Sequence, residues 1–256
     1  MSINTQQRDW RGLVLPLALL AAWIGVTNYN LANSAILASP LEVIKEGIKQ
    51  ISSGALFLDL FFSVSRYLGG FALGSLAGIA FGSLLGISRW ADRLLSPSFN
   101  TIKQIAIFAW IPLISVWVGM GEPAKIVFIA IAAFYPTTIN TFEGIRSVHR
   151  DHVEVARVFE FSRWQLFRKV VLPSASPQIL TGIQLALIYG WLATIGAEYF
   201  LKSGYGVANA MVDGREHFNM ALVLFGVVVV GITGAIINQI ATKLERRQLR
   251  WRNRSA

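Results

Sequence analysis

Long apolar blocks recur along the chain, and shorter polar connections separate them. Each block is close to the length of roughly 20 residues that a helix needs to cross a hydrocarbon core of about 30 Å. The blocks lie at residues 13–29, 61–87, 102–119, 124–142, 179–200 and 220–241. This pattern predicts an all-α membrane protein with about six transmembrane helices, forming a single transmembrane domain over residues 1–256.

Two of the connections have an amphipathic pattern. In residues 40–53, Leu41, Ile44, Ile48 and Ile51 recur at helical spacing opposite a charged face, which predicts an interfacial helix. Residues 150–179 alternate apolar and charged side chains in the same way, and Pro173 and Pro177 mark the return to the membrane. The second segment is predicted to form a helix, a turn and another helix along the membrane surface.

The composition agrees with a membrane protein and argues against several kinds of site. Hydrophobic residues make up 54% of the chain and charged residues 14%, which leaves too little polar surface to cover a soluble globule. The chain contains no cysteine, and its three histidines, His149, His152 and His217, are too scattered to predict a metal site or an embedded enzyme. The phosphate-binding pattern G-x-x-x-x-G-K-[ST] is also absent, so any nucleotide hydrolysis is expected from a partner.

Basic residues favour one side of the predicted membrane. The richer side includes Arg89, Arg93, Lys103, Arg146, Arg150 and Lys243, and the poorer side holds Lys45, Lys49, Arg66, Lys125, Lys202 and Arg215. The positive-inside rule therefore predicts a cytoplasmic tail at 1–12, a cytoplasmic loop at 150–173 and a basic cytoplasmic tail at 243–256. This topology explains the net charge of +9 without a nucleic-acid partner, and the last tail serves either as an anchor or as a contact for acidic lipid.

Five glycines in the second block are spaced four residues apart, which places them on one side of a helix. They are Gly70, Gly74, Gly78, Gly82 and Gly86. Such a stripe lets another helix backbone approach closely, so it predicts packing within the subunit, with a moving subunit interface as the alternative.

Glu154, Ala156, Leu172 and Pro173 carry a resemblance to a known family. This segment resembles the E-A-A loop of ABC importer permeases. Glu154 and Ala156 match the first and third letters of that motif, and Leu172 and Pro173 match its closing L-P. Val155 replaces the second letter. The resemblance implies a cytoplasmic coupling helix that docks on an ATPase through Glu154, Val155, Ala156, Arg157, Phe159, Glu160, Leu172 and Pro173, with Ala156 against the partner. Glu160 stands where the family has glycine, and a left-handed backbone there would cost about 1 kcal/mol.

Three further segments extend the resemblance. Residues 111–126 are similar to the P-L-x-x-x-W-x-G segment of permeases for nitrate, sulfonate, taurine and bicarbonate. Their F-P-x-x-x-N-x-x-x-G-x-R signature is matched by Pro136, Asn140, Gly144 and Arg146. Their A-E segment followed by S-G-x-G is matched by Ala197, Glu198, Ser203, Gly204 and Gly206.

The resemblance implies a type I importer permease in a bacterial inner membrane, closest to the aliphatic sulfonate permeases. It further implies a second permease subunit, expected to form a homodimer, two cytoplasmic ATPases that bind ATP and Mg, and a periplasmic substrate-binding protein. Such a chain is a transport subunit without an ATPase site or cofactor of its own. An aliphatic sulfonate is the preferred cargo, and taurine, nitrate, bicarbonate and a pyrimidine precursor remain alternatives. A non-transporting scaffold or receptor is the alternative of another class.

Polar side chains inside the apolar blocks are candidates for lining a pathway, because polar groups in lipid face protein or water. They are Ser115, Thr137, Thr138, Asn140, Thr181, Gln184, Tyr189, Thr194 and Glu198. Hydrogen bonding between helices is the alternative for each. Glu198 lies near a predicted span end, where hydration at the outer interface is a further alternative.

Overall fold

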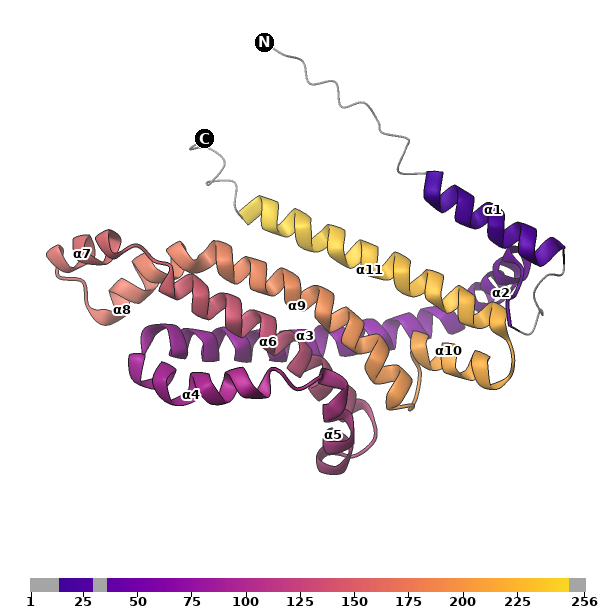
Figure 1. Cartoon of the computed structure of the whole chain (residues 1–256), viewed down its shortest axis with the longest axis horizontal. Coiled ribbons are helices and arrows are strands. Elements are labelled where there is room, and N and C mark those ends of the chain that lie inside the picture. The colour runs from indigo at the N-terminus through magenta and orange to yellow at the C-terminus, as the bar shows by residue number, and fades with distance from the viewer. Residues whose placement is uncertain (1–13, 30–35, 249–256) are drawn as a thin grey trace, which may run out of the picture. The chain divides into compact units, whose positions relative to one another are not determined.

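The computed structural model describes residues 14–29 and 36–248, with side chains described as far as Lys243. Within these ranges every regular element is helical (Figure 1). The elements are α1 (Val14–Asn28), α2 (Pro40–Ser52), α3 (Ala55–Ile87), α4 (Arg89–Ile102), η2 (Ile107–Trp110), α5 (Ile111–Val118), α6 (Glu122–Arg146), α7 (Arg150–Val158), α8 (Arg163–Leu166), η3 (Phe167–Val171), α9 (Leu172–Phe200), α10 (Val207–Glu216) and α11 (Met220–Gln248). The predicted tail at 1–12 and most of the predicted tail at 243–256 lie outside the described residues.

Two compact units share these elements. The first comprises the chain up to Phe57 together with Ala210–Val228, and the second comprises Leu58–Asn209 together with the chain from Val229 onward. Each unit is described separately, and the expectation of a single domain stays a prediction.

Fewer continuous spans are present in the described residues than the sequence pattern predicted. Four helical stretches are long and apolar enough to cross a membrane, namely Ala55–Ile87, Glu122–Arg146, Arg163–Phe200 and Met220–Lys243. The block at 13–29 forms the shorter apolar helix α1, and the block at 102–119 is not one helix. Its residues belong to a broken pair, Arg89–Ile102 and Ile107–Val118, whose two arms meet at 95°. Counting that pair as one span gives up to five, below the predicted six.

In the second unit, the glycine stripe of α3 lies against α6. An added Cβ at Gly74 would stand 2.1 Å from the carbonyl oxygen of Ala130, and one at Gly82 would stand 2.5 Å from that of Thr138. Cβ atoms added at Gly70, Gly78 and Gly86 would stand 2.6, 2.8 and 2.8 Å from the side chains of Ile129, Thr137 and Ile145 in α6. Close backbone approach of this kind brings helices together where lipid is as apolar as the side chains.

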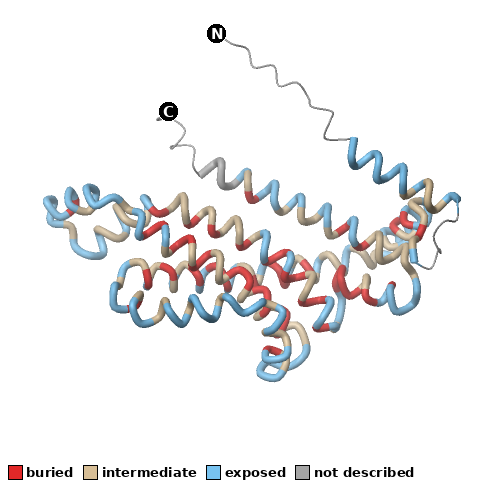
Figure 2. Tube along the Cα trace, viewed as in Figure 1, coloured by how far each residue is buried: buried red, intermediate tan, exposed pale blue. Residues whose placement is uncertain are grey.

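Helix α6 also packs along α9, so it forms the centre of the second unit. Gly182 of α9 meets Asn140 and Pro136 of α6, and Gly144 of α6 meets Gln178 of α9. The buried apolar cluster between these helices and their neighbours consists of Ile114, Ala124, Phe128, Ile129, Ala132, Ala193, Ala197 and Leu201. Burial is accordingly concentrated along α6 and the facing side of α9 (Figure 2).

In the first unit, α2 begins with a capping box. The Ser39 hydroxyl accepts the backbone N–H of Glu42, and the Glu42 carboxylate accepts the backbone N–H of Ser39 at 2.7 Å. These hydrogen bonds hold the pKa of Glu42 below its usual value. Gly47 meets the Phe225 ring, whereas the predicted apolar face with Leu41 and Ile48 remains exposed.

The segment that returns from α7 is one continuous helical stretch rather than a separate helix punctuated by prolines. It runs from Arg163 through α8, η3 and α9 to Phe200. The η3 turn is a π-helix, in which the N–H of Leu172 donates to the carbonyl of Phe167. A π turn changes the local pairing just before Pro173, which has no N–H to donate, and this lets the helix continue past the proline.

Candidate functional site

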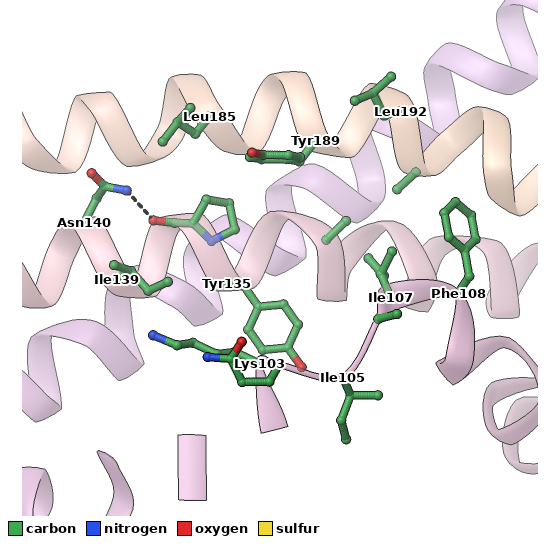
Figure 3. Close-up of a pocket in the computed structure, with 15 residues that line it drawn as sticks. Lys103, Ile105, Ile107, Phe108, Tyr135, Ile139, Asn140, Leu185, Tyr189 and Leu192 are labelled. Atoms are coloured by element: carbon green, nitrogen blue, oxygen red, sulfur yellow. Dashed lines mark hydrogen bonds between the residues drawn. The ribbon is translucent and has the colours of Figure 1, made fainter. Parts of the chain in front are cut away.

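A cavity of about 680 Å³ opens in the second unit between the α4–η2 connection, α6 and α9 (Figure 3). Its size is within the range of about 300–1,000 Å³ that small-molecule sites occupy. The wall is formed by Lys103, Gln104, Ile105, Ala106, Ile107, Phe108, Ala132, Tyr135, Pro136, Ile139, Asn140, Leu185, Tyr189, Leu192 and Ala193. Most of these side chains are apolar, so the cavity suits a ligand with an apolar portion.

Asn140 and Tyr189 are the predicted pathway residues that line this cavity. Asn140 is held on α6, where its Nδ2 donates to the Pro136 carbonyl at 2.8 Å and its Oδ1 accepts Nε2 of Gln178 at 3.1 Å. Tyr189 comes from α9 on the opposite wall, next to Leu185 and Leu192 (Figure 3). The cavity lies at mid-depth of α6, because its α6 residues surround Pro136 near the middle of Glu122–Arg146.

The other predicted pathway residues do not line this cavity. The hydroxyls of Ser115, Thr137, Thr181 and Thr194 donate to carbonyls three or four residues earlier in their own helices. Gln184 donates to the Thr242 hydroxyl at 3.5 Å, and Thr138 lines a neighbouring pocket of about 110 Å³. These four hydroxyl contacts lie within single helices, and only the Gln184–Thr242 contact is a hydrogen bond between helices of the kind that the sequence left as an alternative.

Glu198 is fully buried, so the hydrated position considered from the sequence is wrong. Its Oε1 accepts the Ser63 hydroxyl at 2.6 Å and pairs with the Arg66 guanidinium at 2.5 Å. Arg66 also pairs with Glu122, which in turn lies 3.4 Å from Lys125 Nζ. Two cations and two carboxylates therefore form one network that joins α3, the start of α6 and the end of α9.

This charged network also holds the segment before α10 and the start of α10. Glu198 Oε2 accepts the Ala208 N–H at 3.0 Å, and Lys125 Nζ donates to the Ser203 carbonyl at 2.5 Å. An added Cβ at Gly206 would stand 2.6 Å from the Glu198 carboxylate carbon, which explains why a glycine is needed there. The A-E and S-G-x-G segments therefore meet in a structural cluster and not at the cavity.

The sequence reasoning assigned Arg66 and Lys125 only to a charge count. The signal that points to their pairing is that both fall within or at the edge of apolar blocks, because a charge inside a membrane requires a partner. Lys103, Gln104 and Tyr135 of the cavity wall were also missed as site residues. Lys103 and Gln104 lie at the sharp bend after α4, which the apolar pattern does not reveal.

The predicted coupling segment contains α7 and the turn that follows it. The N–H of Phe161 donates to the carbonyl of Ala156, and that of Glu160 donates to the carbonyl of Arg157. Glu160 has a left-handed φ of 54°, and these bonds form a Schellman ending in which glycine is the usual residue. The glutamate at the family's glycine position therefore keeps the glycine-type backbone.

The exposed side of α7 carries apolar side chains. Val158 is 81% exposed and Phe159 70%, and Val155 is also exposed. Ala156 is 3% exposed within the chain itself, so the expectation that it lies against a partner is wrong. Of the remaining coupling residues, Glu154, Arg157, Glu160 and Pro173 are exposed and Leu172 is half-buried.

Comparisons with known proteins agree with this architecture. Residues 70–250 match the family described as binding-protein-dependent transport system inner membrane component. The Bacillus subtilis protein named for aliphatic sulfonates transport, SsuC, is 36% identical over 95% of this chain and 88% of its own length, and the Escherichia coli protein of that name is 36% identical over 93% and 90%. The bicarbonate transport system permease protein CmpB of Synechococcus elongatus is 30% identical over 95% and 93%. A chain of the inward-facing MetNI methionine ABC transporter has a TM-score of 0.66 and 19% identity over 75% of this chain and 95% of its own length, which shows a shared fold.

Proposed function

This chain belongs to the family of binding-protein-dependent transport system inner membrane components. We propose that it carries an aliphatic sulfonate inward by alternating access. It is an ABC importer permease, a transport subunit without its own ATPase site. A second copy completes the pathway, two cytoplasmic ATPases that bind ATP and Mg drive it, and a periplasmic binding protein delivers the cargo.

The apolar cavity is the observation that carries the sulfonate proposal. An alkyl chain removes apolar wall from water, which is favourable by about 25 cal/mol per Å². Bicarbonate and nitrate have no such portion, although the 30% identity to a bicarbonate permease makes bicarbonate the second candidate. The two relatives at 36% identity are named for aliphatic sulfonates, in agreement with the wall chemistry.

The proposed orientation has both termini in the cytoplasm of a bacterial cell, with α7 on the cytoplasmic side. The positive-inside distribution supports this arrangement, and the exposed apolar side of α7 suits a soluble partner. Reporter fusions after Ser88 and Asp151 should give cytoplasmic signals, and fusions after Gln50 and Gly121 should give periplasmic ones. A periplasmic signal at Asp151 would exclude an ATPase contact through α7.

Uptake in liposomes tests the cargo. The full chain is assembled with its cognate ATPase and binding protein, and ATP-driven uptake of labelled propanesulfonate is measured against competing taurine, nitrate and bicarbonate. Propanesulfonate uptake that nitrate and bicarbonate leave unchanged is the expected result. Uptake of labelled bicarbonate without uptake of propanesulfonate would make bicarbonate the first candidate. A chain that leaves the ATPase rate unchanged and moves no cargo would instead be a scaffold or receptor.

A further inference from the structure

Lys103 lies in the break between the arms Arg89–Ile102 and Ile107–Val118, beside the middle of the candidate span Glu122–Arg146, whereas the charge pattern predicted it in a surface connection. Helix α4 runs back along α3 and α6, and Phe99, one turn before Lys103, makes tilted and edge-on ring contacts with Phe81, Phe134 and Tyr135. Phe81 belongs to the span Ala55–Ile87, and the other two rings lie near the middle of Glu122–Arg146. Lys103 follows them into the wall of the cavity, on the same side as Tyr135 and Ile139 (Figure 3).

The ammonium group of Lys103 forms no salt bridge among the described residues. No carboxylate there lies within 4.0 Å of it, and its one contact with an aromatic ring is 6.0 Å from the Phe99 centroid. The cavity wall contains no acidic side chain. Arg66 and Lys125 differ sharply, because each is buried and paired with Glu122 or Glu198.

Placing an unpaired cation beside the middle of a membrane span costs free energy unless water or an anionic ligand contacts it. We propose that Lys103 binds the anionic head group of the cargo and so selects anions, while the alkyl portion lies on the apolar wall. The phenol groups of Tyr135 and Tyr189 and the amide of Gln104 line the same cavity and offer neutral hydrogen bonds to an oxyanion. This inference rests on the proposed function, because it names the residue that recognises the cargo.

A second role for Lys103 has to be separated from the first. Lys103 also lines the neighbouring pocket of about 110 Å³, together with Glu143 and Asn100. A lysine that merely served Glu143 would be structural, and Glu143→Gln would then reproduce the effect of losing the lysine. A lysine that binds cargo should leave Glu143→Gln close to wild type in uptake.

The absence of cysteine from the chain allows the charge to be removed and restored at one position. Lys103→Cys is labelled before assembly with 2-aminoethyl methanethiosulfonate, which restores a cation, or with methyl methanethiosulfonate, which adds a neutral group of small size. Each protein is then assembled with the ATPase and binding protein in liposomes. ATP-driven propanesulfonate uptake, basal ATP hydrolysis and labelling by mass spectrometry are measured. Lys45→Cys, on the exposed face of α2, receives the same reagents as the matched control.

We expect Lys103→Cys to lose uptake by about tenfold or more, because a desolvated charge contact is removed. The aminoethyl label should restore uptake to within about threefold of wild type, the methyl label should not, and basal hydrolysis should stay unchanged. Every Lys45→Cys protein should match the wild type.

Three results would overturn the proposal: wild-type uptake by unlabelled Lys103→Cys, equal uptake with the two labels, or a cysteine that no reagent reaches. A tenfold loss in Glu143→Gln would also overturn it in favour of the structural role. Wild-type protein that couples to the ATPase but moves none of propanesulfonate, taurine, nitrate and bicarbonate would overturn the proposed function itself. The two failures are therefore distinguishable.

Discussion

Arg66 Nη1 and Glu198 Oε1 lie 2.5 Å apart in an ion pair that joins α3 to α9, and neither side chain is more than 3% exposed. Glu198 also receives the Ser63 hydroxyl and the Ala208 N–H, so one carboxylate connects three separate parts of the chain. A buried ion pair gives little net stability compared with an apolar pair of the same shape, but removing one partner leaves an uncompensated charge.

Glu198→Ala should therefore unfold at a markedly lower temperature than wild type. The free energy of unfolding is expected to fall by about 3–5 kcal/mol, which is typical when one partner of a buried ion pair is removed. Thermal unfolding of the detergent-solubilised chain measures it, with Glu154→Ala as the control because that glutamate is exposed and lies outside the network. The double variant Arg66→Met with Glu198→Leu should recover part of the loss. Equal melting temperatures for Glu198→Ala and wild type would show that the pair is not desolvated.

The glycine stripe gives a prediction with a neighbouring control. Gly74→Ala would place a methyl group 2.1 Å from the Ala130 carbonyl oxygen, so α3 and α6 would have to separate. Overpacking typically costs about 1–3 kcal/mol. Gly69→Ala changes the same helix where nothing lies within 4 Å of the new methyl group, and it should be neutral or slightly stabilising. Comparing melting temperatures of the two variants decides the point, and equal values would mean that α3 and α6 do not approach closely in the membrane.

The period of the apolar pattern predicted the helical class and most of the spans, because lipid forces the backbone to satisfy its own hydrogen bonds. It failed at residues 102–119, where the apolar letters continue through a 95° break. A block average cannot detect such a break, since the bend preserves hydropathy and changes only direction. The charge count, and not the block average, assigned Lys103 to a cytoplasmic connection, although it falls within the apolar block 102–119.

The sequence could predict those features that depend only on residues close together in the chain. Four-residue glycine spacing gives one helix face, and a glycine position in a loop motif gives a left-handed turn at Glu160. The cavity wall was not predictable, because α4, α6 and α9 meet there through contacts between distant parts of the chain. Glu198 shows the same limit: its partners Ser63 and Arg66 lie more than a hundred residues away in sequence.

Glu160 holds a backbone conformation that disfavours residues with a Cβ. Glu160→Gly should therefore stabilise the end of α7 by about 1 kcal/mol, and Glu160→Val should destabilise it by at least as much. Amide hydrogen exchange of Arg157 and Phe161 in the assembled permease reports the local opening. Faster exchange in Glu160→Gly than in wild type would contradict the left-handed turn.

Ala156 and Val158 should respond oppositely to a charged substitution on α7. Val158→Asp changes a side chain that is 81% exposed, so the chain should keep its melting temperature but lose association with the ATPase. Val158→Ile is the control and should bind normally. Ala156→Asp buries a carboxylate against the chain itself, and it should lower the melting temperature before any partner is added. Normal ATPase pull-down by Val158→Asp would remove this face of α7 from the proposed interface.

Substitutions at Glu154 can distinguish a contact with the ATPase from capping of α7. It is the fifth residue of Arg150–Val158, beyond the first turn where a carboxylate stabilises a helix amino end, and its carboxylate has no hydrogen bond or ion pair among the described residues. Its charge is therefore free for a charge-assisted hydrogen bond from the ATPase. Glu154→Gln should keep the melting temperature and reduce ATPase association by about tenfold, whereas Asp151→Asn, in the first turn, should mainly lower the stability of α7. Co-purification at increasing salt measures the contact, because a charge contact weakens as the ions screen it. Salt-independent binding that is equal in Glu154→Gln and wild type would leave Val158 and Phe159 as the contacts that hold the partner.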